Sequence, residues 1–219
     1  LGEETTPSVV YFESPEDVVV GRDAKSLARL YPDLVVEMVM RQMGKDVHYS
    51  FHGQDHTPES VSALILRELA RAAQRETGEE VRDVVITVPA YFGLLEREAT
   101  HKAGQIAGLN VLDILDEPVA AALNHQALGE DAGARTILVY HLGRGTFDIT
   151  VIRVARDDVH AICTDGDQHL GGADWDNAIR DFLLRGFTEQ NPECEAASNE
   201  EFMQELACSA EPLKVSWLR

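Results

Sequence analysis

Residues 138–152, LVYHLGRGTFDITVI, place a tight Gly-x-Gly turn between two apolar runs. The turn and the residue after it are Gly143, Arg144, Gly145 and Thr146. Backbone N–H groups in such turns donate hydrogen bonds to phosphate oxygens. The pattern predicts a β-hairpin whose turn could hold a phosphate, although a lone Gly-x-Gly turn is a weak signal because structural needs alone explain most such turns.

Other segments carry groups that suit a nucleotide and its metal ion. Lys25 follows a glycine in GRDAK, and a lysine near a terminal phosphate neutralises developing charge or orients the attacking water. Glu117 follows a strand and Asp148 follows the turn, and carboxylates suit Mg²⁺, usually through water. Gly171 and Gly172 precede a helix start, where backbone amides can bind anions.

Each of these residues also has a purely structural interpretation. Lys25 alone is typical of a solvated helix, Glu117 of a first helical turn, and Asp148 of a turn capped by an Asx hydrogen bond. Three histidines are spaced four residues apart: His48, His52 and His56. The alternating residues around them favour strand and loop over a helical stripe, so a metal site there is a minor alternative.

The chain has 219 residues, of which 38 are acidic and 19 basic, and its formal net charge is −19. Nucleic acid and anionic membranes are disfavoured as partners, because the chain has no surplus of basic residues to neutralise their phosphates. The excess of acidic residues is explained by the solubility that it gives the protein. Three cysteines without a Cys-x-x-Cys motif predict neither zinc nor disulfides, and a reducing cytoplasm fits best. No apolar run could span a bilayer. The chain opens without Met, so we expect it to begin inside a longer protein and to be truncated at its end.

Periodicity predicts alternating strands and helices. The expected strands are 8–13, 17–20, 47–53, 83–89, 110–115, the two arms of the hairpin around 143–145, and 158–164. The expected helices are 21–25, 33–43, 58–77, 94–107, 119–128 and 174–187. Strands 83–89 and 110–115 are continuous apolar runs, typical of strands covered on both faces. The order indicates an α/β architecture with a mixed sheet, and the loop 129–135 is the candidate lobe boundary.

Five segments, TTPSVVYF, VVITVPAYF, REATHKAGQIAGLNVLDILDEPVAAAL, LGRGTFDITVI and GDQHLGGADWDN, resemble the ATPase domain of the heat shock protein 70 (DnaK-type) chaperone family. The resemblance runs from Thr5 to about Asn177. It implies a ribonuclease-H-like, actin-like ATPase fold and an incomplete two-lobed nucleotide-binding domain with mixed sheets. The first lobe would be 1–134, with 8–57 as its outer subdomain, and the second, truncated lobe would start in 135–219.

In that family ATP or ADP lies with Mg²⁺ between the lobes, and hydrolysis controls the grip of an attached domain on unfolded polypeptides. The resemblance therefore implies a chaperone for protein folding and stress response. It further implies a cytoplasmic protein whose partners are client polypeptides and co-chaperones.

Residue by residue, the resemblance implies catalytic roles for Lys25, Glu117 and Asp148. Asp148, and Glu117 through water, would hold the metal. Cofactor binding would involve the phosphate turn and the glycine pair beside the cleft: Gly143, Arg144, Gly145, Thr146, Gly171 and Gly172. Pro89 and Arg97 match a pair that couples nucleotide state to the neighbouring domain.

Two residues depart from the family pattern. His141 stands where the family has Asp, and we expect weaker metal binding, because a neutral imidazole offers one lone pair and a protonated one repels Mg²⁺. Arg144 stands where the family has Gly. It could grip phosphate, but we favour steric or conformational damage in a turn that could require positive φ.

Two functions stay open after these departures. One is an ATP hydrolase, of which this chain alone would be inactive. The other is a catalytically impaired relative that acts as a binding or scaffold module. A sugar or acetate kinase of the same superfamily is a weaker third possibility.

Overall fold

The computed structural model describes residues 5–127, 134–155 and 158–217. The chain divides into two compact units. The larger unit comprises Leu1–His141 and Asp148–Gly166, and the smaller unit comprises Leu142–Phe147 and Asp167–Arg219. The lobe boundary predicted in the loop 129–135 falls mostly outside the described residues and stays a prediction. None of the helices in the described ranges is both long and apolar enough to cross a bilayer.

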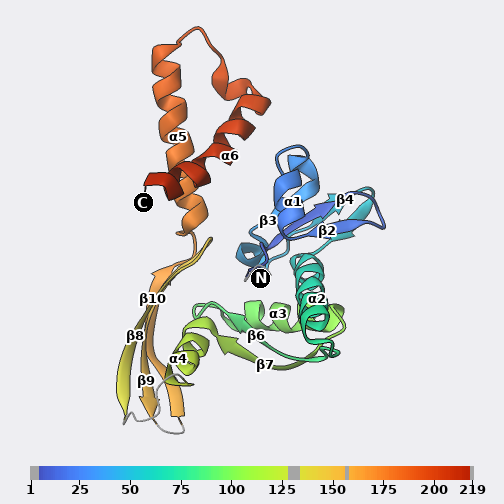
Figure 1. Cartoon of the computed structure of the whole chain (residues 1–219), viewed down its shortest axis with the longest axis vertical. Helices are drawn as coiled ribbons and strands as arrows, with labels where there is room; N and C mark the ends of the chain where they lie inside the picture. The colour runs from blue at the N-terminus through green and yellow to red at the C-terminus, as the bar shows by residue number, and fades with distance from the viewer. Residues whose placement is uncertain (1–4, 128–133, 156–157, 218–219) are drawn as a thin grey trace. The chain divides into compact units, whose positions relative to one another are not determined.

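The larger unit begins with a three-stranded antiparallel sheet (Figure 1). Its strands are, in spatial order, β2 (Val18–Val20), β1 (Val9–Phe12) and β3 (Val35–Glu37). All four residues of the central strand β1 are buried, as its apolar, β-branched run predicts. The helix α1 (Arg22–Leu27) follows β2 at Gly21, whose φ of 90° favours glycine. The strands β1 and β2 and the helix α1 confirm the prediction.

The helix predicted at residues 33–43 is wrong. This stretch contains a 3₁₀ turn η1 (Pro32–Leu34), the strand β3 and a second 3₁₀ turn η2 (Val39–Gln42). Val35 and Val36 are β-branched and pair with β1, and Val36 is only 4% exposed, in the same core as Phe12. Burial against β1 therefore outweighs the helix signal of a proline at the first position.

A hairpin and a long helix follow. They are β4 (Tyr49–Phe51), β5 (Gln54–His56) and α2 (Pro58–Thr77). A turn at His52 and Gly53, both with positive φ, interrupts the single strand predicted at 47–53, whereas the helix lies near its predicted position. Thr57 Oγ1 accepts a hydrogen bond from Ser60 N–H at 3.4 Å, and Ser60 Oγ accepts one from Thr57 N–H at 2.9 Å. Gly78 ends the helix with a φ of 73°. The predicted amino-terminal cap and glycine stop of this helix are confirmed.

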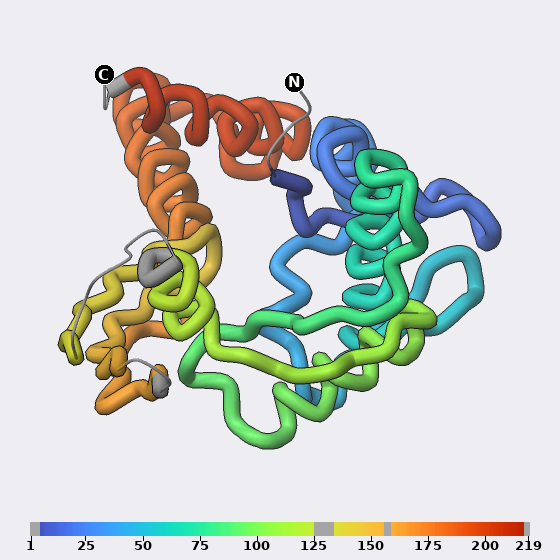
Figure 2. Tube along the Cα trace, turned by 60° about the horizontal axis from the view of Figure 1, so that its bottom comes forward, coloured from blue at the N-terminus to red at the C-terminus, as the bar shows by residue number. Residues whose placement is uncertain are grey.

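Two parallel strands and the helix between them form the next layer of the larger unit. The strands are β6 (Asp83–Val88) and β7 (Asn110–Asp116), which run side by side in green in Figure 2, and the helix is α3 (Leu94–Ile106). Gly104 allows α3 to pack closely here. An added methyl group would collide with Val111 and lie 3.0 Å from Ile86.

The expectation that these strands are covered on both faces is wrong for the described residues. Val85 of β6 is 53% exposed and Leu112 of β7 is 63% exposed, whereas Val88 is buried. One face of the pair packs against α3, with which Val88 shares an apolar cluster. The two apolar runs therefore predicted strands correctly, but they did not predict correctly that both faces of these strands are buried.

The site described below depends on the sheet that follows. Its strands lie in the order β10 (Asp158–Asp167), β9 (Phe147–Ala155) and β8 (Arg135–Leu142), and α4 (Glu117–Ala127) packs on it (Figure 1). The core between α4 and β9 contains Val119, Ala122, Ile152 and Val154. The predicted meander of three strands is confirmed.

The smaller unit contains two helices that pack against each other (Figure 1). They are α5 (Gly172–Gln190) and α6 (Glu200–Trp217), with a 3₁₀ turn, η3 (Ala196–Ser198), between them. The rings of Phe187 and Phe202 lie 5.0 Å apart across this contact. The helix predicted at 174–187 is confirmed, whereas α6 was not predicted.

Candidate functional site

Three side chains from neighbouring elements meet in the larger unit. Glu117 is the first residue of α4 and directly follows β7. His141 lies near the end of β8, and Asp148 near the start of β9. The chain therefore brings together a carboxylate at a helix start and two residues that flank the Gly-x-Gly turn in sequence.

The ligand atoms of these side chains are close enough to share one ion. His141 Nδ1 lies 3.3 Å from Glu117 Oε2 and 3.7 Å from Asp148 Oδ2. One ligand atom from each of the three residues lies within 4.8 Å of the other two. Within residues 5–127, 134–155 and 158–217, this is the only such group of histidine, cysteine, aspartate and glutamate side chains. Glu117 and Asp148, both predicted as metal residues, are thus neighbours.

The strand period explains why Asp148 is buried. Asp148, Thr150, Ile152 and Val154 alternate along β9 and are all buried on one face. Asp148 is 1% exposed, and neither of its carboxylate oxygens has a hydrogen-bond partner within the described part of the chain. The Nδ1 atom of His141 is likewise buried without a hydrogen bond there. Buried polar groups of this kind nearly always have a partner, so the site is set up for one.

Burial also determines the acidity of the two carboxyl groups. Burial raises the pKa of Glu117, the charge of His141 opposes that shift, and the charge of Asp148 adds to it. Burial raises the pKa of Asp148 as well, and His141 again opposes the shift. Both carboxylates are therefore held in an environment that favours a neutral or cation-bound form.

The donor set fits the predicted magnesium ion only in part. Glu117 and Asp148 offer the oxygen atoms that Mg²⁺ prefers, but the nearest atom of His141 is an imidazole nitrogen. Mg²⁺ is a hard ion that takes oxygen ligands, whereas imidazole suits zinc, copper, iron and nickel. The predicted weakening of magnesium binding by His141 therefore has a clear physical basis in the structure.

In the smaller unit, the turn packs directly on the start of α5. The Gly172 N–H donates to Gly143 O at 2.9 Å, and the Ala173 N–H donates to Arg144 O at 2.8 Å. A methyl group on Gly171 would collide with the backbone of Arg144 and Gly145. Gly171 thus allows the close packing and Gly172 donates a hydrogen bond to the turn, while their predicted contact with a nucleotide stays a prediction.

The amides at the start of α5 are used within the chain. Besides the two bonds to the turn, the Gly171 N–H donates to Asp174 Oδ2 at 2.8 Å. The turn itself is closed by the Gly143 N–H, which donates to Thr146 O at 2.9 Å. A phosphate bound at this helix start would therefore have to replace or share existing hydrogen bonds.

Arg144 fits its turn without backbone strain. Among the described residues, the non-glycine residues with positive φ are Met38 and His52, so Arg144 is not in the left-handed region. The expected conformational damage by positive φ is therefore wrong. The guanidinium Nη1 lies 3.7 Å from Glu211 Oε2 of α6, and both side chains are partly exposed. Whether Arg144 grips phosphate stays a prediction.

The remaining predicted residues lie in the larger unit. Lys25 is in α1 and is half-buried, and its catalytic role stays a prediction. Arg97 forms an ion pair with Asp116 at the end of β7, and its Nε donates to Phe92 O at 3.0 Å. Asp116 was not predicted, although its place at a strand end directly before Glu117 was visible in the sequence.

None of the three spaced histidines belongs to a group of possible metal ligands among the described residues. His52 Nε2 lies 2.9 Å from Phe12 O, and the ring of His56 lies 4.6 Å from that of Phe12. His48 lies 3.2 Å from Asp46, a neighbour in sequence. His52 and His56 thus contact Phe12 of the core, and a metal site at these histidines stays a minor alternative.

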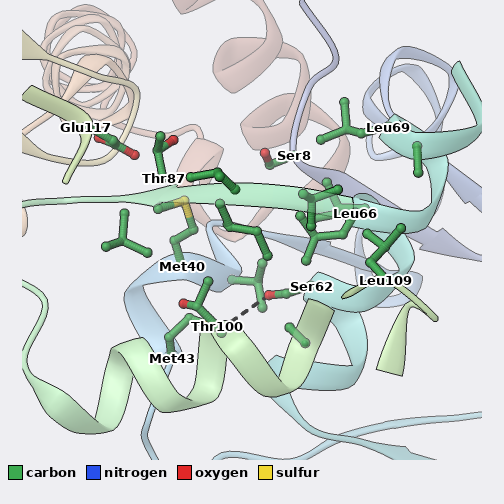
Figure 3. Close-up of a pocket in the computed structure, with 18 of the residues that line it drawn as sticks. Ser8, Met40, Met43, Ser62, Leu66, Leu69, Thr87, Thr100, Leu109 and Glu117 are labelled. Atoms are coloured by element: carbon green, nitrogen blue, oxygen red, sulfur yellow. Dashed lines mark hydrogen bonds between the residues drawn. The ribbon is translucent and has the colours of Figure 1, made fainter. Parts of the chain in front are cut away.

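An apolar cavity of about 510 Å³ lies in the larger unit, lined mainly by α2, β6 and α3 (Figure 3). Leu66 and Leu69 line it, and the hydroxyl of Ser62 donates to Met43 Sδ at its wall. Glu117 is the only charged residue in its lining. The cavity therefore lacks the cationic side chains that commonly bind phosphate, and among the predicted site residues only Glu117 lines it.

Comparison with known proteins identifies the chain's relatives. The family model described as "Hsp70 protein" matches residues 46–217. The "Chaperone protein DnaK" of Thermosipho africanus is 38% identical over 214 residues, covering 98% of this chain and 36% of that protein. The chain thus spans about a third of the length of this relative. These matches confirm the predicted fold class, the α/β fold of the actin-like ATPase superfamily.

Proposed function

The chain belongs to the Hsp70 protein family, and from this premise we propose that it is part of the nucleotide-binding domain of a molecular chaperone. The domain binds ATP or ADP, and the bound nucleotide controls how an attached domain holds unfolded polypeptides. Co-chaperones are the further partners, and the cytoplasm is the proposed location. The relative whose name carries the chaperone function is longer than this chain, so the activity is that of a larger protein.

The observation that carries the proposal is the pairing of Glu117 with Asp148 around His141. Burying two carboxylates is costly for folding, the more so because Asp148 has no hydrogen-bond partner among the described residues. Clusters of titratable groups with shifted pKa values concentrate at functional sites. Gly143, Gly145 and Thr146, which lie between His141 and Asp148 in sequence, are the proposed phosphate contacts. Lys25 is the proposed group that orients the attacking water.

The same site favours a second candidate, a relative with impaired hydrolysis. An aspartate at position 141 would complete an all-oxygen set for Mg²⁺, and His141 replaces it with nitrogen. No hydrolytic step through Mg²⁺ is therefore assigned to the site as it stands. A module that binds nucleotide but turns it over slowly would still act as a scaffold or as a nucleotide-dependent binding partner.

Calorimetry and turnover on the full-length protein separate these functions. Titration with ATP and with ADP should release or absorb heat at saturable stoichiometry, and no heat with either nucleotide would overturn the proposal. His141→Asp should raise magnesium-dependent turnover by about tenfold or more, equivalent to about 1.4 kcal/mol of barrier. Arg144→Gly tests the turn alone and the double variant tests both. Unchanged turnover in all three would show that these residues do not limit hydrolysis.

A further inference from the structure

We propose that Glu117, His141 and Asp148 form a binding site for a divalent transition-metal ion of the Zn²⁺ and Co²⁺ class, with one ligand position left open. This site goes beyond the proposed function because it requires no nucleotide and no second unit. All three residues belong to the larger unit. The metal-site proposal can therefore fail while the proposed nucleotide binding holds, and nucleotide binding can fail while the metal site is confirmed.

The distances in the structure fit four-coordinate geometry. A tetrahedral Zn²⁺ site with metal–ligand distances of about 2.0–2.1 Å places neighbouring ligand atoms roughly 3.3–3.4 Å apart. His141 Nδ1 lies 3.3 Å from Glu117 Oε2 and 3.7 Å from Asp148 Oδ2. All three ligand atoms lie within 4.8 Å of one another, so side-chain adjustment would bring the remaining pair, Glu117 and Asp148, to this spacing.

The types of ligand select the same class of ion. Zn²⁺ accepts both imidazole nitrogen and carboxylate oxygen as ligands, and a zinc site with three protein ligands keeps its fourth position for water. The two negative charges balance a dication when the imidazole is neutral. Mg²⁺ would have to accept the imidazole nitrogen or leave it unused, so the site should discriminate against Mg²⁺.

Burial provides an independent indication of a ligand. Asp148 is 1% exposed, its two carboxylate oxygens have no hydrogen-bond partner among the described residues, and Oδ2 faces His141 Nδ1. Leaving a buried polar group unpaired costs about 1–3 kcal/mol. A single ion would satisfy Asp148 and the buried Nδ1 atom of His141 together.

The site also has an entrance and a rigid base. The side chains of His141 and Glu117 are 39% and 24% exposed, so an ion can enter from their side and keep a water ligand there. The backbone beneath them is fixed by the apolar core that joins α4 to β9. Ligands on packed helices and strands hold metal geometry better than ligands on loops.

Cobalt spectroscopy on the full-length, metal-free protein tests the site directly. Co²⁺ should give the intense visible absorption of a four-coordinate ion at one equivalent, and Zn²⁺ should displace it. A tenfold molar excess of Mg²⁺ over Co²⁺ should leave the bands in place. No such bands, or their displacement by that amount of Mg²⁺, would overturn the proposal.

Variants assign the ligands. His141→Asp should weaken Co²⁺ and Zn²⁺ binding by at least tenfold while improving Mg²⁺ binding, and Asp148→Asn should weaken both transition ions by a similar factor. His101→Asn removes an exposed histidine of α3 outside the site and should change nothing. Circular dichroism checks that each variant is folded. Bands that persist unchanged in both site variants, or that vanish in the His101 control, would place the ion elsewhere and overturn the assignment.

Discussion

The buried carboxylate of Asp148 should make the metal-free protein less stable at neutral pH than an isosteric amide would. Its pKa is raised by burial, so the folded state binds its proton more tightly than the unfolded state does. Stability from this group is therefore complete below the ordinary pKa of about 3.9 and is lost as the pH rises through the raised pKa. Asp148→Asn removes that loss at neutral pH but changes little at low pH.

The size of the effect follows from the lack of a hydrogen-bond partner for Asp148 among the described residues. An unsatisfied buried polar group costs about 1–3 kcal/mol, and each kcal/mol shifts the melting temperature of a protein of this size by about 2–4 °C. Scanning calorimetry in a chelating buffer at pH 7 should thus show the transition of the larger unit several degrees higher in Asp148→Asn. The difference should shrink toward pH 4.

A metal ion should shift the comparison toward the wild type. At a Zn²⁺ concentration 100 times the wild-type dissociation constant, the wild type gains about 2.7 kcal/mol, whereas a variant that binds Zn²⁺ tenfold more weakly gains about 1.4 kcal/mol. Asp55→Asn, which changes an exposed aspartate of β5, should show neither effect. If Asp148→Asn is less stable than the wild type at pH 7 without metal, then the carboxylate has a stabilising partner and the reasoning is refuted.

Three further changes test the packing that supports the site. Gly104→Ala should destabilise the protein by about 1–3 kcal/mol in urea unfolding, because the new methyl collides across β6 and β7, whereas Gly186→Ala, with nothing within 4 Å, should gain up to about 1 kcal/mol. Arg97→Met should cost about 1–3 kcal/mol in the same assay, since it leaves the half-buried Asp116 carboxylate without its charged partner. Thr57→Ala should cost about 1 kcal/mol and speed amide exchange in the first turn of α2. Equal stability of the two glycine variants would contradict the close packing at Gly104. Unaltered stability of Arg97→Met would contradict the ion pair with Asp116, and unchanged amide exchange in α2 would contradict the Thr57 cap.

Local rules in the sequence predicted the elements whose ends are set by local chemistry. The threonine cap and glycine stop of α2 are examples, because each depends on residues within a few positions. The segment 33–43 failed because its conformation is decided by pairing with β1, more than twenty residues away in sequence. Propensity carries no information about such a partner.

The site was predictable in its members but not in its geometry. Glu117 and Asp148 were assigned to a metal from residue type and family resemblance, and His141 was identified as the departure. The 3.3 Å contact between His141 and Glu117 depends on how α4 packs against the sheet, which no local pattern specifies. The pairing of Arg97 with Asp116 was missed for the same reason, since it joins a helix to the strand that follows it.

The sheet itself explains why a change at position 141 alters chemistry and not the fold. Along β8, Ile137, Val139 and His141 alternate on the half-buried face, and the first two pack in the core with Ile152 of β9. The apolar residues fix the register of the strand, so any side chain at position 141 points toward the same carboxylates. His141→Asp should therefore change the free energy of folding of the metal-free protein by less than it changes the preference between Mg²⁺ and Zn²⁺. Because the register is independent of residue 141, the identity of that single ligand sets the choice of metal.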